Sequence, residues 1–535
     1  MGSKGVIFFY GVAALLYLIV GDRVHAIQRN AADANHIFSG TTAVAEFGRS
    51  LAAAGDMDSD GYDDVVVGAP GAFDQGRVFI FSGKTGQLFK TLQGPASASR
   101  FGYAVSRGGR MLGMQQSVLV SDPFDRSGYV GKVYVYGLNS TAPLMEWNCD
   151  GIENQKCGWA IAGGCDLDSD GNDDVIVGAL DGGSNGAGKI FVYSGAHGNL
   201  LWSKQGAAHA DQFGDKISCA GDVNQDGFDD VIVGAWGNDS NGSQSGAAYV
   251  YSGRDAELLY EFKGGFNDTF GYSVGGGGDL NGDGYDDVVV GAPSNNRGYA
   301  AAFSGRTGEI LFHWNGYADL GLRMGSSVAI VADQDADGRD EVLIGDSSYD
   351  SYRGQVSLFS GTDGTLIDRY IGENDQIIDD NYFGESVAFI GDANRDGGWD
   401  FVIGAPQNDQ GGTAAGRVYL FYGAISQQPP PPPPPDGEAG GGGNGGGTEN
   451  PPPPPPPDPE EPQVCPVCPE PVVCPPAPAV DYEDVLAWLL INNKSLTKEQ
   501  RRTLEKLISN PHEKPDRKLL DWLKRWISKW KVGKK

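Results

Sequence analysis

The stretch AGDMDSDGYDDVVVGAP, residues 54–70, decides the fold of this chain. It places five aspartates within nine residues and then becomes apolar. The pattern D-x-D-x-D-G occurs in several calcium loops, including the EF-hand, in which a bidentate glutamate stands at the twelfth position and helices flank the loop. Counted from Asp56, the twelfth residue is Val67, inside a run of β-branched residues that predicts a buried strand. The pattern therefore indicates a cation loop attached to a strand, not to a helix.

The acidic motif recurs along the chain at a regular spacing. Six copies begin at Asp56, Asp166, Asp222, Asp279, Asp333 and Asp392, at intervals of 110, 56, 57, 54 and 59 residues. The first interval is twice the others, so one copy has lost its acidic loop. A second mark gives seven units: Phe47-Gly48, Phe101-Gly102, Cys157-Gly158, Phe213-Gly214, Phe270-Gly271, Met324-Gly325 and Phe383-Gly384. A third mark, Gly-Ala-Pro or a variant of it, follows each loop. A period of this length indicates a repeat architecture.

Each unit contains four short predicted strands and no helical period. In the first unit the strands are expected at 50–54, 65–68, 77–81 and 87–92. Four antiparallel strands repeated radially form a propeller blade. The seventh unit runs into prolines before its outer strand, and residues 36–40 stand before Phe47 as an outer strand stands before Phe101. We therefore expect an all-β, seven-bladed β-propeller closed by an N-terminal strand, which removes the open sheet edge.

The succession FG, D-x-[DN]-x-D-G-x-x-D and Gly-Ala-Pro resembles the FG-GAP repeat of integrin α-subunit heads and of exported bacterial proteins. The resemblance covers residues 34–424. It implies a seven-bladed propeller with calcium in the loop between the first and second strands of a blade. It also implies a module for adhesion or ligand recognition, secreted or at the cell surface.

The chemistry of the loops fits calcium, which takes about six to eight oxygen ligands. In the first loop we expect side-chain ligands from Asp56, Asp58, Asp60 and Asp64 and a backbone carbonyl from Tyr62. The corresponding sets are Asp166, Asp168, Asp170, Asn172 and Asp174; Asp222, Asn224, Asp226, Phe228 and Asp230; Asp279, Asn281, Asp283, Tyr285 and Asp287; Asp333, Asp335, Asp337, Arg339 and Glu341; and Asp392, Asn394, Asp396, Gly398 and Asp400. About six calcium sites are therefore expected.

Two positions of the loop are left outside the predicted ligand set. The eighth position is acidic in five loops but is Trp399 in the last one, and the twelfth position is apolar in all six. The apolar twelfth position excludes the EF-hand. The alternative to a metal site is a solvated acidic turn, which we disfavour because converging carboxylates repel one another unless a cation is present.

The N-terminus and the cysteines indicate export. Residues 1–26 contain Lys4, an apolar stretch and a small-residue cleavage pattern ending at Ala26, as in a secretory signal peptide, with an uncleaved anchor as the alternative. In an exported protein, two disulfides can form, between Cys149 and Cys157, which are close in sequence, and between Cys165 and Cys219, which occupy similar places in successive repeats; the sequence leaves the connectivity open. Three cysteines remain, Cys465, Cys468 and Cys474. They could form a disulfide between two chains, and the more specific alternative is that they bind a metal.

The C-terminal part differs in composition from the repeats. Residues 427–479 form a spacer rich in proline and glycine, and residues 481–535 predict a basic three-helix domain. This domain could attach to an anionic membrane or cell-wall surface, or its basic face could simply be solvated. The net charge of −30 argues against a nucleic-acid partner.

The sequence leaves three functional hypotheses open. The first is an adhesion or ligand-recognition module that binds an extracellular protein or glycan. The second is a calcium-dependent enzyme that acts on polysaccharides, and the third is a structural surface-layer component. Clustered His, Tyr, Arg or Lys outside the repeat would favour the enzyme, and the sequence alone reveals no such cluster and no catalytic residue.

Overall fold

The computed structural model describes residues 27–95, 99–125, 129–294, 297–316, 323–373 and 381–423. The chain divides into two compact units, Met1–Pro434 and Pro435–Lys535. All the described residues belong to the first unit. The predicted signal segment, the spacer with Cys465, Cys468 and Cys474, and the predicted C-terminal domain lie outside them. Within the described ranges, no helix is long and apolar enough to cross a membrane.

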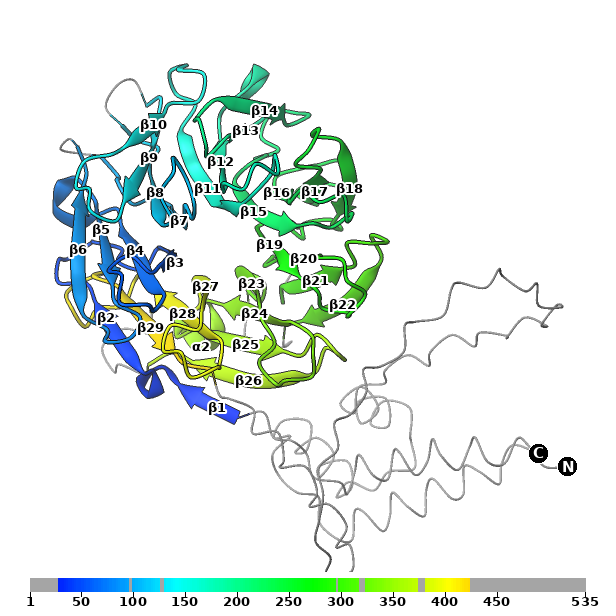
Figure 1. Ribbon diagram of the computed structural model, residues 1–535. Coiled ribbons are helices and arrows are strands. Elements are labelled where there is room, and N and C mark those ends of the chain that lie inside the picture. Colours follow the sequence, from blue (N-terminus) through cyan, green and yellow to red (C-terminus); the bar gives the residue numbers. More distant parts are fainter. Residues whose placement is uncertain are drawn as a thin grey trace, which may run out of the picture. The chain divides into compact units, whose positions relative to one another are not determined.

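Seven sheets succeed one another around a central axis, so the predicted seven-bladed propeller is confirmed (Figure 1). The first three blades are β3 (Ser50–Gly55), β4 (Asp64–Ala69), β5 (Arg77–Phe81) and β6 (Leu88–Gln93); β7 (Val105–Arg107), β8 (Ser117–Asp122), β9 (Lys132–Gly137) and β10 (Met145–Trp147); and β11 (Cys157–Cys165), β12 (Asp174–Ala179), β13 (Lys189–Tyr193) and β14 (Leu200–Gln205). Within each of these blades the four strands are antiparallel and follow chain order outward from the axis.

The other four blades have the same arrangement, except that the outer strand of the last blade comes from the N-terminal end of the chain. They are β15 (Lys216–Gly221), β16 (Asp230–Ala235), β17 (Ala247–Tyr251) and β18 (Leu258–Lys263); β19 (Ser273–Gly278), β20 (Asp287–Ala292), β21 (Tyr299–Phe303) and β22 (Ile310–Asn315); β23 (Ser327–Val331), β24 (Glu341–Asp346), β25 (Gln355–Phe359) and β26 (Leu366–Ile371); and β27 (Ser386–Gly391), β28 (Asp400–Ala405), β29 (Arg417–Phe421) and β2 (His36–Ser39). In the described ranges, helical turns are confined to connections, at Ala31–Asp33, Ala72–Asp74, Ser184–Gly186 and α2 (Tyr349–Tyr352).

The N-terminal strand closes the ring as predicted. β2 pairs antiparallel with β29, with His36 opposite Leu420 and Ser39 opposite Arg417. The imidazole Nε2 of His36 also lies 2.9 Å from the hydroxyl of Tyr422. The last blade therefore consists of three strands from the C-terminal end of the ring and one from its N-terminal end, and its outer edge is paired.

A further strand was not predicted. β1 (Ile27–Asn30) pairs parallel with β26 and adds a fifth strand to the sixth blade. Its Arg29 guanidinium lies 3.2 Å from the carboxylate of Asp368 and over the ring of Tyr370. The chain therefore crosses the outside of two neighbouring blades before it enters the first one (Figure 1).

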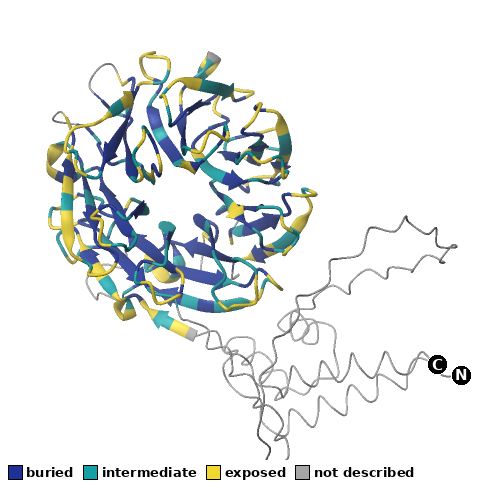
Figure 2. Ribbon diagram, viewed as in Figure 1, coloured by how far each residue is buried: buried dark blue, intermediate teal, exposed yellow. Residues whose placement is uncertain are grey.

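The core lies between adjacent blades. The second strand of every blade is buried at all six of its positions, whereas the exposed residues lie mainly in the loops and on the outer strands (Figure 2). Val66 and Ile80 of the first blade pack with Phe101 and Val118 of the second in one buried cluster. The FG phenylalanine therefore fills the space between its own blade and the preceding one.

The glycines of the repeat allow two blades to approach at the backbone. A Cβ added to Gly68 would lie 2.2 Å from the carbonyl oxygen of Gly102, the FG glycine of the next blade. The same approach recurs in the other blades that have a glycine at this position, and a Cβ added to Gly404 of the seventh blade would lie 2.3 Å from the carbonyl oxygen of Gly48 of the first. The second blade has Ser121 there. Only a residue without a side chain fits at such a contact.

Both disulfides that the sequence left open as pairings are present. Cys165 of β11 is bonded to Cys219 of β15, which joins the innermost strands of the third and fourth blades. Cys149 is bonded to Cys157 and ties the segment after β10 to the start of β11. Each bridge therefore connects two successive blades.

Candidate metal centres and axial ring

The six acidic loops all follow the innermost strand of a blade and precede its second strand, so they lie on one face of the propeller. The sixth residue of each loop is a glycine with a φ between 83° and 91°. In each loop the first carboxylate accepts a hydrogen bond from the N–H of this glycine, for example over 3.0 Å from Gly61 to Asp56 and over 2.8 Å from Gly171 to Asp166. The bend therefore turns the loop back onto its own first residue.

In three loops the structure brings carboxylate oxygens to within 4.8 Å of one another. These groups are Asp56, Asp58 and Asp64; Asp166, Asp168 and Asp174; and Asp333, Asp335, Asp337 and Glu341. In the other three loops an asparagine replaces the second acid: Asn224, Asn281 or Asn394. The fifth-position acids Asp60 and Asp170 lie outside these groups and accept hydrogen bonds from the backbone N–H groups of Tyr62 and Asn172.

The ninth-position acid is buried in every loop, with no exposed surface. In the fourth blade, Asp230 accepts hydrogen bonds from the N–H of Val223, over 3.0 Å, and of Gly253, over 3.1 Å. Burial raises the pKa of this carboxyl to about 7, and the neighbouring loop acids add to the effect. Burial likewise raises the pKa to about 7 in Asp64, Asp174, Asp287 and Asp400, and to about 9 in Glu341.

Two of the buried loop oxygens have no hydrogen-bond partner among the described residues, Asp56 Oδ1 and Glu341 Oε1. A buried carboxylate oxygen without a donor is costly unless a cation or a proton satisfies it. The donor set of these loops consists of carboxylate, amide and carbonyl oxygens, the ligands that hard cations such as calcium prefer. The residues present therefore fit an oxygen-coordinated divalent cation.

The eighth-position acids make a contact that the sequence did not reveal. Asp229 of the fourth blade accepts a hydrogen bond from the N–H of Asp166, the first loop residue of the third blade, over 2.9 Å. Its own N–H donates to the carbonyl oxygen of Asp166 over 3.2 Å. We call the four acids that make this contact to the preceding blade the interblade carboxylates: Asp173, Asp229, Asp286 and Asp340.

The second blade carries a basic loop in place of the acidic one. Arg110 stands at the first loop position, and its N–H donates to Asp173 of the third blade over 2.6 Å. Its guanidinium donates to the carbonyl oxygen of Gly171 over 3.3 Å. A side-chain cation therefore lies next to the acidic loop of the third blade.

The opposite face carries a second group that the sequence did not single out. The residue after each FG dipeptide lies at or just before the start of the innermost strand, at the end away from the acidic loops. We call these seven residues the axial ring: Arg49, Tyr103, Trp159, Asp215, Tyr272, Ser326 and Glu385. The FG glycines are constant at this point of the repeat, but the next residue differs in chemistry from blade to blade.

Several members of the axial ring contact one another. The guanidinium of Arg49 donates to the hydroxyl of Tyr103 over 3.1 Å and lies over its ring. The centroids of the Tyr103 and Trp159 rings are 4.8 Å apart, and the Trp159 indole N–H donates to Asp215 over 2.6 Å. Burial raises the pKa of Tyr272 to about 12, so its hydroxyl stays protonated at neutral pH. Aromatic faces, donors and acceptors are therefore held together by residues from separate blades.

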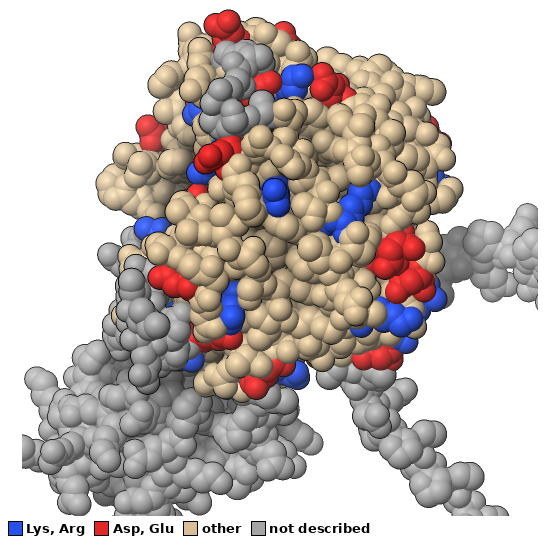
Figure 3. Space-filling view, turned by 90° about the vertical axis from the view of Figure 1, so that its left-hand side faces the viewer, with Lys and Arg blue, Asp and Glu red and all other residues tan. Residues whose placement is uncertain are grey.

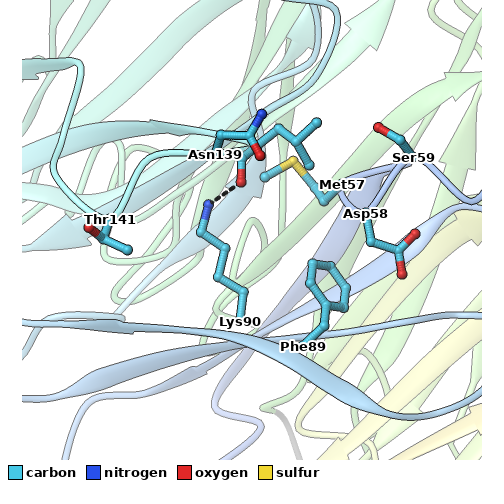
Figure 4. A pocket seen from close by; sticks show the side chains of 8 residues that line it. Met57, Asp58, Ser59, Phe89, Lys90, Asn139 and Thr141 are labelled. Atoms are coloured by element: carbon cyan, nitrogen blue, oxygen red, sulfur yellow. Dashed lines mark hydrogen bonds between the residues drawn. The ribbon is translucent and has the colours of Figure 1, made fainter.

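A pocket of about 450 Å³ borders the first acidic loop (Figure 4). It lies between Met57, Asp58 and Ser59 of the loop and Leu138, Asn139 and Thr141 of the second blade. The ammonium of Lys90 donates to the carbonyl oxygens of Gly137 and Leu138 over 2.7 Å each. Lys90 therefore points to these carbonyls and not to Asp58 (Figure 4).

Comparisons with known proteins agree with the fold. The FG-GAP repeat family matches residues 47–81, 158–193, 217–251 and 270–308. Integrin alpha-4 of Xenopus laevis is 29% identical over 249 residues, which are 43% of this chain and 24% of that protein. Integrin alpha-5 of Xenopus laevis is 31% identical over 216 residues, 36% of this chain and 20% of that protein. Integrin alpha-V of Gallus gallus is 31% identical over 205 residues, 35% of this chain and 20% of that protein.

The chain spans about a quarter or less of each of these relatives. Four of the seven units match the family directly, and the other three share their strand order. The chain therefore contains FG-GAP repeats, and it is similar to part of the integrin alpha subunits.

Proposed function

We propose that this chain is an extracellular recognition module that binds a protein or glycan ligand at the axial ring. The observation that carries the proposal is the chemical variety of the ring at a position where the repeat is otherwise constant. Packing requires the FG glycine in each blade, but it does not require Arg, Tyr, Trp, Asp and Glu in succession around one axis. Aromatic side chains with nearby hydrogen-bonding groups are typical of recognition surfaces.

The side wall of the propeller is less suited to this role. On the face drawn in Figure 3, acidic and basic side chains are scattered among uncharged ones. Arg49, Tyr103, Trp159, Tyr272 and Glu385 of the axial ring are all at least partly exposed. A ligand that enters the ring would therefore meet aromatic faces, a cation and carboxylates within one small area.

The test is an array of glycans and extracellular proteins probed with the whole protein. Trp159→Ala is expected to abolish binding, because it removes the largest aromatic face of the ring. Trp202→Ala is the matched control: Trp202 belongs to the outer strand of the same blade, and its indole N–H donates to the carbonyl oxygen of Gly253. Equal loss of binding in both variants would refute the proposal, as would unchanged binding in Trp159→Ala. Turnover of a glycan would instead favour the hypothesis of an enzyme that acts on polysaccharides.

We further propose that the six acidic loops bind calcium and that calcium stabilises the blades. The support is the oxygen donor set, the convergence of carboxylates in three loops and the unpartnered oxygens of Asp56 and Glu341. The ligands would be those expected from the sequence. If the calcium concentration is about ten times the dissociation constant, each site contributes about 1.4 kcal/mol to the free energy of unfolding. An unchanged melting temperature after chelation would refute calcium as a structural ion.

Secretion or display at the cell surface is part of the same proposal. It is supported by the signal-like N-terminal sequence, the two disulfides and the likeness to integrin alpha subunits. We propose that residues 481–535 attach the propeller to an anionic membrane or cell-wall surface and that Cys465, Cys468 and Cys474 can link two chains. Cell fractionation and sedimentation of the whole protein with anionic vesicles test the attachment, and non-reducing electrophoresis tests the link.

A further inference from the structure

The interblade carboxylates connect acidic loops that belong to different blades. Asp229 directly precedes Asp230, the buried acid of the fourth loop, and binds both backbone polar groups of Asp166 in the third loop. The same pair of bonds joins Asp286 to Asp222, over 2.8 and 3.5 Å, and Asp340 to Asp279, over 2.9 and 3.4 Å. Three such connections join the loops of the third, fourth, fifth and sixth blades into one series.

We propose that these connections couple cation binding, so that the loops of the third to sixth blades fill as one cooperative unit. The proposal rests on calcium binding by the loops. A cation held by Asp230 orders the segment that carries Asp229, and Asp229 in turn fixes the backbone of Asp166. The neighbouring loop then loses less conformational freedom when it binds its own cation, which is positive cooperativity.

This coupling is reciprocal, because linkage requires that two sites change each other's affinity by the same factor. Couplings between sites in proteins typically amount to about 5- to 150-fold in affinity. The buried acid of a loop and the first acid of the preceding loop are separated along this path by one residue and one hydrogen bond. Such a short path, made of backbone and a half-buried carboxylate, has little freedom to absorb a displacement.

The series ends where the interblade carboxylate is missing. In the seventh blade, the eighth loop position is occupied by Trp399 instead of an aspartate. The partner loop in the sixth blade also differs: the residue before its first acid is Ala332, whereas four other acidic loops have glycine at that position. The contact that remains there is from the side chain of Gln334 to the carbonyl oxygen of Trp399, over 2.9 Å. It engages neither backbone group of Asp333, so the loop of the seventh blade is expected to bind independently of the sixth.

At the junction of the seventh and first blades the arrangement also differs. Asp63 stands at the eighth position of the first loop and is close to the positive charges of Arg107 and Arg395. Among the described residues, no hydrogen bond joins Asp63 to Asp392. At the other end of the series, Asp173 binds Arg110 of the second blade, which has no acidic loop. The cooperative unit is therefore bounded on both sides.

The experiment is a calorimetric calcium titration of the whole protein with three single variants. Asp286→Ala removes the side-chain acceptor of the middle connection and leaves its backbone bond. Asp286→Asn keeps an oxygen that can accept the bond from Asp222, and Trp399→Asp supplies the missing carboxylate. For the wild type we expect a binding curve steeper than that of independent sites. Asp286→Ala should flatten the curve and raise the calcium midpoint by about fivefold or more. Asp286→Asn should stay close to the wild type, and Trp399→Asp should steepen the curve.

The outcomes separate this proposal from calcium binding itself. Calcium binding with the same curve shape in the wild type, Asp286→Ala and Trp399→Asp would overturn the coupling and leave the calcium sites in place. No heat of binding in the wild type would overturn both. Asp286→Asn behaving as Asp286→Ala would overturn the hydrogen bond as the means of coupling. If Asp286→Ala fails to fold, an unchanged curve in Trp399→Asp still refutes the proposal.

Discussion

The buried ninth-position acids predict that the calcium-free protein becomes more stable as the pH falls through neutrality. This is the opposite of the loss of stability that acid commonly causes. In the calcium-free protein, burial raises the pKa of Asp230 and four equivalent aspartates to about 7, well above the value of about 4 in an unfolded chain. The folded state therefore binds more protons than the unfolded state at neutral pH. Stability is lowest above about pH 7 and should rise as the pH falls through this value.

The magnitude follows from the number of protons involved. At pH 7 the five aspartates together bind two to three protons in the folded state, and Glu341, whose pKa is about 9, binds about one more. The free energy of unfolding should then rise by about 4 to 5 kcal/mol for each pH unit lost near neutrality. This change is comparable to the whole stability of many domains, about 5 to 15 kcal/mol.

Bound calcium should abolish this change of the free energy of unfolding with pH. With saturating calcium the loop carboxylates remain ionised in the folded state, as they are in the unfolded chain, so stability should be nearly constant between about pH 8 and about pH 6. Below this window protons compete for the carboxylates and the two curves should converge. Urea unfolding of decalcified and calcium-loaded protein across this range measures both slopes.

Glu341→Gln tests the assignment to the buried acids. The glutamine keeps an oxygen that can accept the hydrogen bond from Gln334 but cannot titrate. It should reduce the slope of the calcium-free protein by about 1.4 kcal/mol per pH unit near neutrality. A calcium-free protein whose stability falls as the pH is lowered from about 8 to 6 would refute the reasoning, as would an unchanged slope in Glu341→Gln.

Three further predictions concern the framework of the propeller. Replacing Cys165 and Cys219 by serine should lower the free energy of unfolding by about 2 to 4 kcal/mol in urea, and equal stability of the reduced and oxidised protein would contradict this. Gly68→Ala should cost about 3 kcal/mol because its Cβ meets a carbonyl oxygen at 2.2 Å, whereas Gly171→Ala, with no atom within 4 Å, should cost about 1 to 2 kcal/mol from its φ of 85°. Deleting β1 alone should leave one cooperative calorimetric transition. Deleting β1 and β2 together should broaden or split this transition, because β2 closes the ring and β1 does not. Identical transitions in the two deletion variants would count against closure by β2.

The sequence predicted the fold well because the same local pattern occurs seven times. The predicted strands of the first blade agree with the structure to within one residue at each end. The closing strand was also predicted, because residues 36–40 fill the place of a missing repeat element. β1 was not predicted, because it is a short strand that belongs to no repeat and pairs parallel with a strand far along the chain.

The candidate sites were predicted only in part. The acidic loops are local motifs, so their residues could be named from spacing alone. The interblade carboxylates act across two blades, and Asp229 binds a residue 63 positions earlier in the chain, a relation that no local pattern contains. The axial ring was not predicted, because in the sequence each of its members is an ordinary residue near the start of a strand. Only the packing of successive blades around the axis brings Arg49, Tyr103 and Trp159 together.

The closure of the seventh blade also has a consequence for the order of folding. His36 and Tyr422, which meet in that blade, are separated by 386 residues. A chain that emerges with its N-terminus first must hold β2 unpaired until all seven units have appeared, and contacts of such long range form slowly. Synthesis stopped anywhere before β29 leaves an open sheet edge at each end of the unfinished ring. The pairing of β2 with β29 can therefore form only after all seven units of the propeller have been synthesised.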